Sequence, residues 1–146
     1  MLEDHGRHHL PSPLDRFWAY WETRLVAGAP PIRNEDFSPT ALRQWLGHLA
    51  LIERDGSGGF RFRLAGTNLQ SRFNPELTGK SFSQIDQATL GDLKDQVHQA
   101  MSRPCPVAKP VWSPNKSQKY FDLVLPLANE VGLIDLVIFA SYPVKP

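Results

Sequence analysis

Two aspartates in the apolar C-terminal part of the chain are the residues best suited to acid–base chemistry. Asp122 interrupts an alternating run from Lys119 to Leu127, and Asp135 interrupts an almost wholly apolar run from Leu133 to Ala140. A small α+β enzyme with a cavity, such as an isomerase or dehydratase, would need a buried carboxyl group or histidine with a shifted pKa. We prefer hydrogen-bonded structural roles for both carboxylates and keep the cavity enzyme as the alternative.

Two other clusters have the residue types of binding sites. His5, His8 and His9 could hold a divalent metal, but they lie in a polar tail without fixed geometry or a second shell of partners, so we predict no metal site. Arg61 and Arg63 alternate with apolar residues and could bind a phosphate or carboxylate. We expect both arginines to form salt bridges with acidic residues of a neighbouring element instead, because cross-strand charge pairs are common.

Composition excludes several functional classes. The chain has 146 residues and a formal net charge of +1, which indicates one domain and argues against a nucleic-acid binder. The single cysteine, Cys105, fits a reducing compartment. No apolar run is long enough to insert into a membrane, and the N-terminus lacks the apolar core of a signal peptide, so we expect a cytoplasmic location. The chain has no Walker phosphate loop, CxxC, HExxH or nucleophile-elbow motif, so we expect no enzymatic activity and no catalytic residues.

The first half of the chain predicts two helices and a hairpin. After a flexible tail, residues 1–13, helical spacing of apolar residues predicts an amphipathic helix over 14–27, stopped by Gly28. Ser38 and Pro39 are start signals for a second, short helix that Gly47 ends. Residues 48–54 and 60–65 then predict a hairpin around a glycine-rich turn. In its second strand Phe60, Phe62 and Leu64 should share one face.

The second half predicts short helices followed by three strands. A short helix around Leu69 and Phe73, a turn over 81–85 and a helix ending before Pro104 lead to a weak strand over 107–112. The strand over 119–127 alternates, with the side chains of Phe121, Leu123, Leu125 and Leu127 on one face. The strand over 133–140 is apolar on both sides, which is typical of a central strand. The sheet should therefore bring the first hairpin beside the last.

This order of elements resembles a PAS domain, and the residues resemble the alphaproteobacterial PAS subfamily long catalogued as proteins of unknown function. The matching segments are Tyr20-Trp21, Gly28, Pro31-x-Arg33, Phe37-Ser38-Pro39, residues 60–67 with the sequence FRFRLAGT, residues 77–80 with LTGK, and residues 123–127 with LVLPL. One departure is Gly47-His48, where a proline is expected before the first strand. The resemblance implies an α+β fold: a five-stranded antiparallel sheet with short helices on one face, preceded by an N-terminal amphipathic helix. The single domain would span 14–146, with the sheet and helical layer over 48–142.

The resemblance also implies a ligand pocket between the sheet and the short helices. Polar anchors could come from Thr67, Asn68 and Asp135. The apolar candidates could instead simply fill the core; they are Phe62, Leu64, Leu69, Phe73, Phe82, Val97, Trp112, Leu123 and Leu125. The cofactor stays unknown. A covalent flavin photosensor needs a cysteine on the short helix, which has none, and His98, at the place of a haem ligand, is one residue off the apolar stripe of its helix.

The aromatic residues of the first helix are the candidates for an interface. Phe17, Trp18, Trp21 and Leu25 share one face of that helix. They could pack on the chain's own sheet or form a two-fold interface. The function that follows from the resemblance is a non-catalytic sensory or regulatory module. It would bind a small ligand or protein partner, form a homodimer, and signal by contact with an unidentified regulatory protein.

Overall fold

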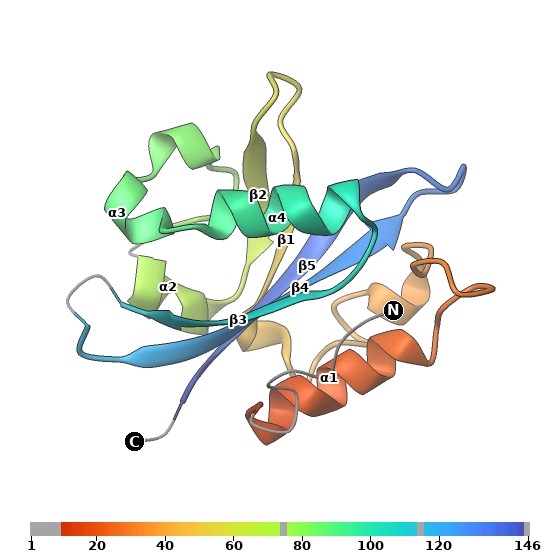
Figure 1. Cartoon of the computed structure of the whole chain (residues 1–146), viewed down its shortest axis with the longest axis horizontal. Coiled ribbons are helices and arrows are strands. Elements are labelled where there is room, and N and C mark those ends of the chain that lie inside the picture. Colours follow the sequence, from red (N-terminus) through yellow and green to blue (C-terminus); the bar gives the residue numbers. More distant parts are fainter. Residues whose placement is uncertain (1–9, 74–75, 114–115, 145–146) are drawn as a thin grey trace.

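Five strands form one antiparallel sheet in the computed structural model, which describes residues 10–73, 76–113 and 116–144 (Figure 1). The strands are β1 (Leu49–Arg54), β2 (Phe60–Ala65), β3 (Val107–Trp112), β4 (Lys119–Ala128) and β5 (Ile134–Pro143). Their order in the sheet is β2-β1-β5-β4-β3. The first hairpin therefore lies beside the last one, as the sequence predicted, and β5 is the central strand.

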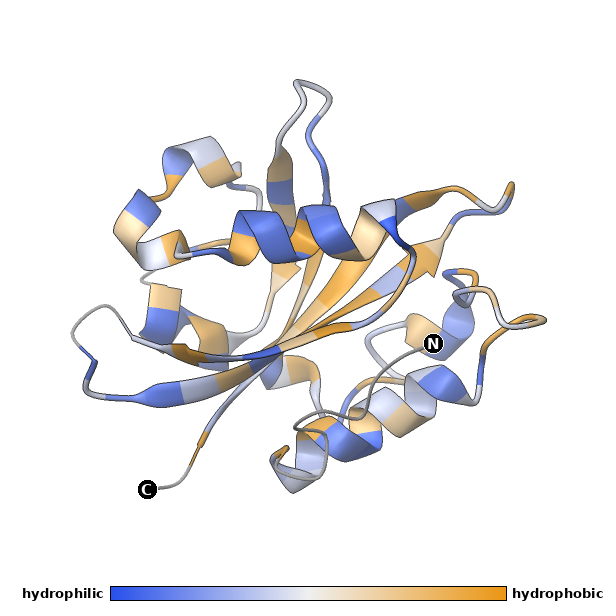
Figure 2. Ribbon diagram, in the orientation of Figure 1, coloured by the Kyte–Doolittle hydropathy of each residue, from blue (hydrophilic) through white to orange (hydrophobic). Residues whose placement is uncertain are grey.

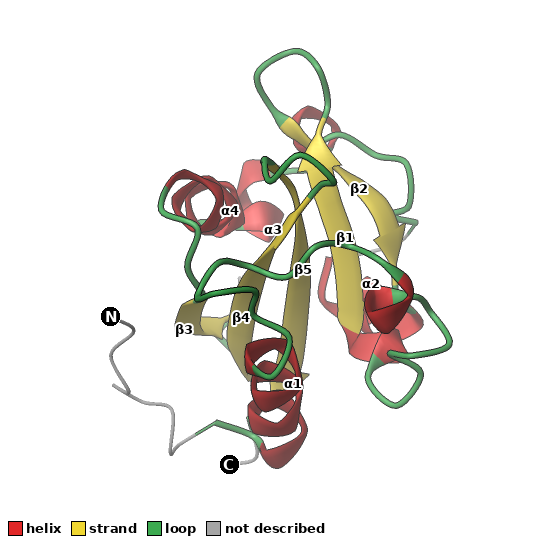
Figure 3. Cartoon of the chain, turned by 90° about the vertical axis from the view of Figure 1, so that its right-hand side faces the viewer, coloured by secondary structure: helices red, strands yellow, loops and turns green. Residues whose placement is uncertain are grey.

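Alternation along β4 and β5 divides the core into two layers. On one face of β4 lie Phe121, Leu123, Leu125 and Leu127, which pack with α1 (Ser12–Glu22). Val124, on the other face, packs beneath α2 (Thr67–Phe73), α3 (Gln87–Leu90) and α4 (Leu93–Ser102). The strands between the two helical layers are therefore mainly hydrophobic (Figure 2). Figure 3 shows α1 apart from α2–α4. Because both faces are covered, β4 and β5 are buried over most of their length.

The first helix is shorter than the sequence predicted. It ends at Glu22 rather than near Ala27. The chain then turns tightly, with Val26 and Ala29 exchanging backbone hydrogen bonds of 3.0 and 2.9 Å. Gly28 lies inside this turn with φ of +82°, a left-handed conformation that glycine adopts without strain. Leu25 lies beyond the helix and is exposed.

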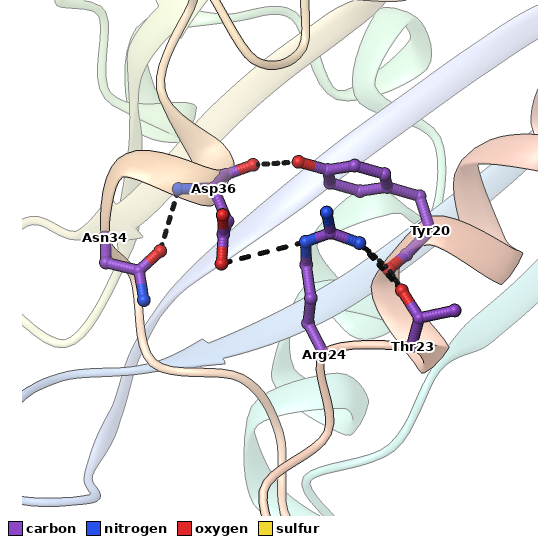
Figure 4. A network of polar contacts seen from close by, with 5 residues as sticks. All are labelled: Tyr20, Thr23, Arg24, Asn34 and Asp36. Atoms are coloured by element: carbon purple, nitrogen blue, oxygen red, sulfur yellow. Dashed lines mark hydrogen bonds and ion pairs between the residues drawn. The ribbon is translucent and has the colours of Figure 1, made fainter.

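A polar network fixes the end of α1 to the segment that follows the turn (Figure 4). The Tyr20 hydroxyl donates to the Asp36 carbonyl oxygen over 2.6 Å, and the Asp36 N–H donates to Asn34 Oδ1 over 2.8 Å. The Arg24 guanidinium lies 3.5 Å from the centre of the Tyr20 ring, and its Nε is 3.7 Å from Asp36 Oδ2. Arg24 Nη1 also donates to Thr23 Oγ1 over 2.7 Å. These contacts attach the C-terminal end of α1 to residues 34–36.

The predicted helix that begins at Ser38 is a series of turns. Residues 39–45 form turns, and a 3₁₀ turn over Leu46–His48 leads directly into β1. Ser38 acts as predicted at the start, because its Oγ accepts a hydrogen bond from the Ala41 N–H over 3.2 Å. Leu42 and Trp45 are buried as predicted. The apolar spacing was therefore right about burial and wrong about helix type.

A β-bulge changes the face of Leu64. Leu51 pairs with Leu64, but the next residue, Ile52, pairs with Phe62, so Arg63 has no opposite partner. One extra residue reverses the alternation beyond it. Phe60 and Phe62 lie under α2–α4, whereas Leu64 faces the side of α1 next to Leu51. The prediction that these three residues share a face was wrong for Leu64.

The two edges of the sheet differ. At β2, Phe62 exchanges backbone hydrogen bonds with Gly79 and Lys80, which cover that edge. At β3, Pro110 stands in the middle of the strand, and β4 is its partner within the described residues. Among the residues described, no helix has the length and apolar character needed to cross a bilayer.

Candidate functional site

Aromatic rings fill the space between the sheet and the α2–α4 layer, where the sequence predicted a ligand pocket. The ring centre of Phe62 lies 6.1 Å from that of Phe73 and 5.1 Å from that of Phe82. Phe73 lies 5.9 Å from Phe139. Each of these side chains, and that of Val97, is buried. Here the structure favours the core-filling interpretation of the predicted pocket residues.

The other predicted pocket residues are dispersed. Leu123 and Leu125 face α1 and are on the opposite side of the sheet from Phe62. Trp112 is 55% exposed at the end of β3, and Thr67 is exposed at the start of α2. The two-layer core explains the dispersal, because residues apart by one position on β4 belong to different layers. The twelve candidates therefore do not surround one cavity.

Asp122 and Asp135 do not form the catalytic pair considered from the sequence. Asp122 pairs with Ser141 across the β4–β5 ladder, six positions along β5 from Asp135. At about 3.3 Å a residue this is roughly 20 Å. Asp135 occupies a bulge at the other end of the ladder, where its Oδ2 lies 3.5 Å from Arg33 Nη2. These positions remove the basis for a two-carboxylate cavity enzyme.

A polar cleft of about 290 Å³ lies between α2 and the ends of β4 and β5. Three of its walls come from segments far apart in sequence: the turn before β1, α2, and the β4–β5 ladder. Two predicted pocket residues, Asn68 and Leu69, line it. The complete lining is His48, Asn68, Leu69, Arg72, Gln118, Tyr120, Ser141 and Pro143. The cleft is small, and six of its eight lining residues have polar side chains, unlike the apolar pocket that the sequence predicted.

An arginine with 5% of its side chain exposed forms the inner wall of the cleft. Arg72 Nη1 donates to Asp122 Oδ1 over 2.5 Å and to Ser141 Oγ over 2.8 Å. Its guanidinium carbon lies 4.5 Å from the ring centre of Phe73 and 5.0 Å from that of Tyr120. Packing on two rings and two polar partners fixes the plane of this guanidinium. A rigid, desolvated arginine is a strong anchor for a planar acceptor group.

Burial dominates the electrostatics of Asp122. Its side chain is fully buried. Burial raises the pKa of Asp122 because the ionised form loses its hydration, and the nearby positive charge of Arg72 offsets part of this rise. Its second oxygen, Oδ2, has no hydrogen-bond partner among the described residues. The ion pair therefore leaves the carboxyl group only partly compensated.

His48 connects the cleft to the layer beneath α1. Its Nδ1 is 3.2 Å from the Ser141 carbonyl oxygen. A carbonyl oxygen only accepts hydrogen bonds, so Nδ1 carries the proton and Nε2 of the neutral ring is an acceptor. Burial lowers the pKa of His48 and favours this neutral form. The imidazole also stacks on Tyr142 at 4.0 Å between ring centres. Tyr142 belongs to the core that packs against α1.

A glycine brings α2 against the turn before β1. At Gly66 a Cβ atom would lie 2.3 Å from the Leu46 carbonyl oxygen and 2.4 Å from that of Gly47. The Gly66 N–H donates to the Leu49 carbonyl oxygen over 2.8 Å. Only a residue without a side chain allows this approach. Gly66 therefore sets the position of α2, and with it Arg72, relative to His48.

The predicted interface residues are mostly covered by the chain itself. Phe17, Trp18 and Trp21 are each at most 4% exposed, because α1 lays its aromatic face on the sheet. The Trp21 indole N–H donates to the Pro126 carbonyl oxygen over 3.0 Å. Leu25 is 38% exposed. A partner would therefore meet Leu25 and the polar outer side of α1 rather than the three buried aromatic side chains.

The remaining candidates lie outside the cleft. His98 is exposed on α4, 3.4 Å from Ser102 Oγ through its Nε2. Arg61 and Arg63 pair with Glu53 on β1 at 2.6 and 3.9 Å, as predicted. Within the described parts of the chain, no group of His, Cys, Asp and Glu side chains could hold a metal ion. The tail histidines His5, His8 and His9 lie outside the described residues.

Sequence reasoning missed six of the eight residues that line the cleft, among them the three that carry its chemistry: His48, Arg72 and Ser141. The signal that could have found Arg72 is its place beside Phe73 on an apolar helix face, opposite an aspartate in an apolar strand. Nothing in the sequence pairs Ser141 with Asp122 except the register of the last hairpin, which depends on the bulge at its turn. His48 was treated only as the start of a strand.

Comparisons with known proteins agree with this architecture. A family profile described as a PAS domain matches residues 9–138. A sensory box sensor histidine kinase from Vibrio cholerae is similar at a TM-score of 0.52 and 20% identity, over 77% of this chain and 100% of that one. The periplasmic domain of RsbU from Chlamydia trachomatis has a TM-score of 0.52 and 15% identity, over 95% of this chain and 46% of that one. No curated protein sequence matches. With the profile covering most of its length, the chain belongs to the PAS domain family.

Proposed function

We propose that this chain is a non-catalytic sensory or regulatory module in which occupancy of the cleft changes the packing of α1 on the sheet. Its PAS fold supports a sensory role at the level of the family. The observation that carries the proposal is the stack of His48 on Tyr142, 4.0 Å apart between ring centres. One ring lines the cleft and the other belongs to the core beneath α1.

The physical route is short. Ser141 and Tyr142 are neighbours on β5 and point to opposite faces of the sheet. A ligand that displaces Ser141 or tilts the His48 ring must therefore move Tyr142 or break its stacking contact. Burial raises the pKa of Tyr142 to about 12, so its phenol stays neutral at physiological pH and the contact is one of packing. Closely packed cores transmit such shifts because they have few voids to absorb them.

The signal would leave through protein contact. The exposed side of α1 carries Asp15 and Arg16, and Leu25 and Val26 are exposed in the turn that follows. We propose that a second copy of the chain, in a homodimer, or an unidentified regulatory protein reads this surface. The cytoplasmic location remains a prediction from the sequence alone.

A cleft-filling substitution tests the coupling without knowledge of the ligand. Asn68→Phe places a ring in the cleft, and Thr67→Phe places the same ring on the preceding, exposed position of α2. We expect amide hydrogen exchange over residues 14–22 to change in Asn68→Phe and not in Thr67→Phe. Equal protection of α1 in both folded variants would refute the coupling. Native mass spectrometry and an absorption spectrum of the purified protein would report subunit number and any retained ligand together.

A further inference from the structure

We propose that the cleft binds a small organic acid that also carries a hydroxyl or amino group. The proposal rests on the proposed function and deepens it, because it names the chemistry of the ligand. It depends on two complementary side chains that line the cleft: Arg72, whose guanidinium only donates hydrogen bonds, and neutral His48, whose Nε2 can accept one.

The described residues do not use all of the hydrogen-bond donors of Arg72. Arg72 uses one of its three nitrogens, Nη1, for both Asp122 Oδ1 and Ser141 Oγ. Its Nε and Nη2 have no protein partner among the described residues, and the side chain lines the cleft. A carboxylate accepts two parallel hydrogen bonds from such an edge, with a geometry that a single-point acceptor does not match. The protein therefore presents a free guanidinium edge to the cleft.

Charge favours an acid over a neutral ligand. Among the described residues Asp122 is the carboxylate at the guanidinium, and its pKa is raised by burial, so it neutralises Arg72 less completely than a solvated aspartate would. The guanidinium also lies among the rings of Phe73, Tyr120 and Phe139. In this poorly solvated setting a second carboxylate interacts with the guanidinium more strongly than it would in water.

The free ring nitrogen of His48 determines which second group the ligand carries. The Nδ1–H of His48 is engaged with the Ser141 carbonyl oxygen, so the remaining ring nitrogen can only accept. A hydroxyl or amino hydrogen on the ligand would satisfy it. Gln118 and Tyr120 supply further polar groups around the same space. A volume of about 290 Å³ limits the ligand to a small molecule, at the lower end of the range of ligand pockets.

Titration of the wild-type protein with matched compounds tests the chemistry. The probes are lactate and 4-hydroxybenzoate, each compared with its amide, which lacks the charge, and with propanoate and benzoate, which lack the hydroxyl. Binding is followed by chemical shifts of backbone amides around Leu69, Arg72 and Ser141. We expect at least one hydroxy acid to bind at these residues with at least tenfold higher affinity than its amide. Amides that bind as well as the acids would overturn the proposal.

Two substitutions separate the roles of the two walls. Arg72→Lys keeps the charge but loses the planar edge, so it should weaken binding of the hydroxy acid at least tenfold. Arg61→Lys, at an exposed arginine of β2, should not. His48→Phe should abolish the preference for hydroxylated compounds and leave the preference for acids. Equal affinities in Arg72→Lys and Arg61→Lys would refute the guanidinium site. If no probe binds but Asn68→Phe still alters exchange in α1, the ligand class is wrong and the proposed function stands.

Discussion

Removal of Arg72 should show that the buried ion pair acts as one unit. In Arg72→Met the Asp122 carboxyl, fully buried, loses its positive partner 2.5 Å away. Breaking a buried pair from one side costs about 3–5 kcal/mol. The whole domain is stabilised by only about 5–15 kcal/mol, so the loss is large enough to measure and leaves a folded population. Urea unfolding followed by tryptophan fluorescence gives the free energy of unfolding.

The pH dependence of that loss has a definite sign. Without Arg72 the pKa of Asp122 rises further, and the native state keeps a proton that the unfolded chain releases. The destabilisation by Arg72→Met should therefore grow from pH 5 to pH 7.5, by at most about 1.4 kcal/mol for each pH unit. At pH 5 part of the cost is avoided because the carboxyl group is protonated.

A double-mutant cycle supplies the control and the refutation. Arg72→Met/Asp122→Leu removes both charges, so it should be more stable at pH 7.5 than the sum of the two single losses predicts. The exposed pair Arg61–Glu53 is the matched comparison, and Arg61→Met should cost only about 0.2–1 kcal/mol. Additive losses at Arg72 and Asp122 at both pH values would refute the reasoning.

Three further predictions concern single positions. Asp122→Asn mimics the protonated carboxyl group. Because burial raises the pKa of Asp122 above its ordinary 3.8, the stability of the wild type relative to this variant should fall as pH rises from about 4 towards neutral. Urea unfolding measures this difference, and a rise with pH would contradict the raised pKa. Gly66→Ala forces a Cβ atom against two backbone carbonyl oxygens and should cost about 3 kcal/mol or more, whereas Gly47→Ala meets only the end of a flexible side chain and should cost less in the same assay. Trp21→Phe leaves the Pro126 carbonyl oxygen without its donor and should lower the free energy of unfolding by about 1–3 kcal/mol. The loss should appear as a lower thermal midpoint, and an unchanged midpoint would show that this hydrogen bond contributes nothing.

The sheet was predictable because its last two strands carry strong local patterns. The alternation around Leu123 and the continuous apolar run around Ile138 are consequences of burial on one or both faces, and both signals lie within single strands. The helical stripe over Leu93 and Val97 was equally clear. The end of α1 was not, since a left-handed turn at Ala27 and Gly28 produces no break in apolar spacing before it.

The candidate site was less predictable because it depends on register and bulges. Leu64 lies on the other face because Arg63 has no opposite residue on β1, and Asp135 is displaced by a bulge beside Leu127. Periodicity has no signal for an extra residue in one strand. Arg72 and Ser141 meet only after α2, β4 and β5 are assembled, so their contact is a property of the tertiary fold.

The proline at the centre of β3 disfavours pairing of that strand with other molecules at high protein concentration. A strand of another molecule that pairs with β3 would find no backbone N–H donor at Pro110, so the intermolecular pairing would stop within a few residues. With the opposite border closed by its own chain at Gly79 and Lys80, the molecule resists stacking strand to strand with its neighbours at high concentration. Self-association would then have to use side chains instead of backbone.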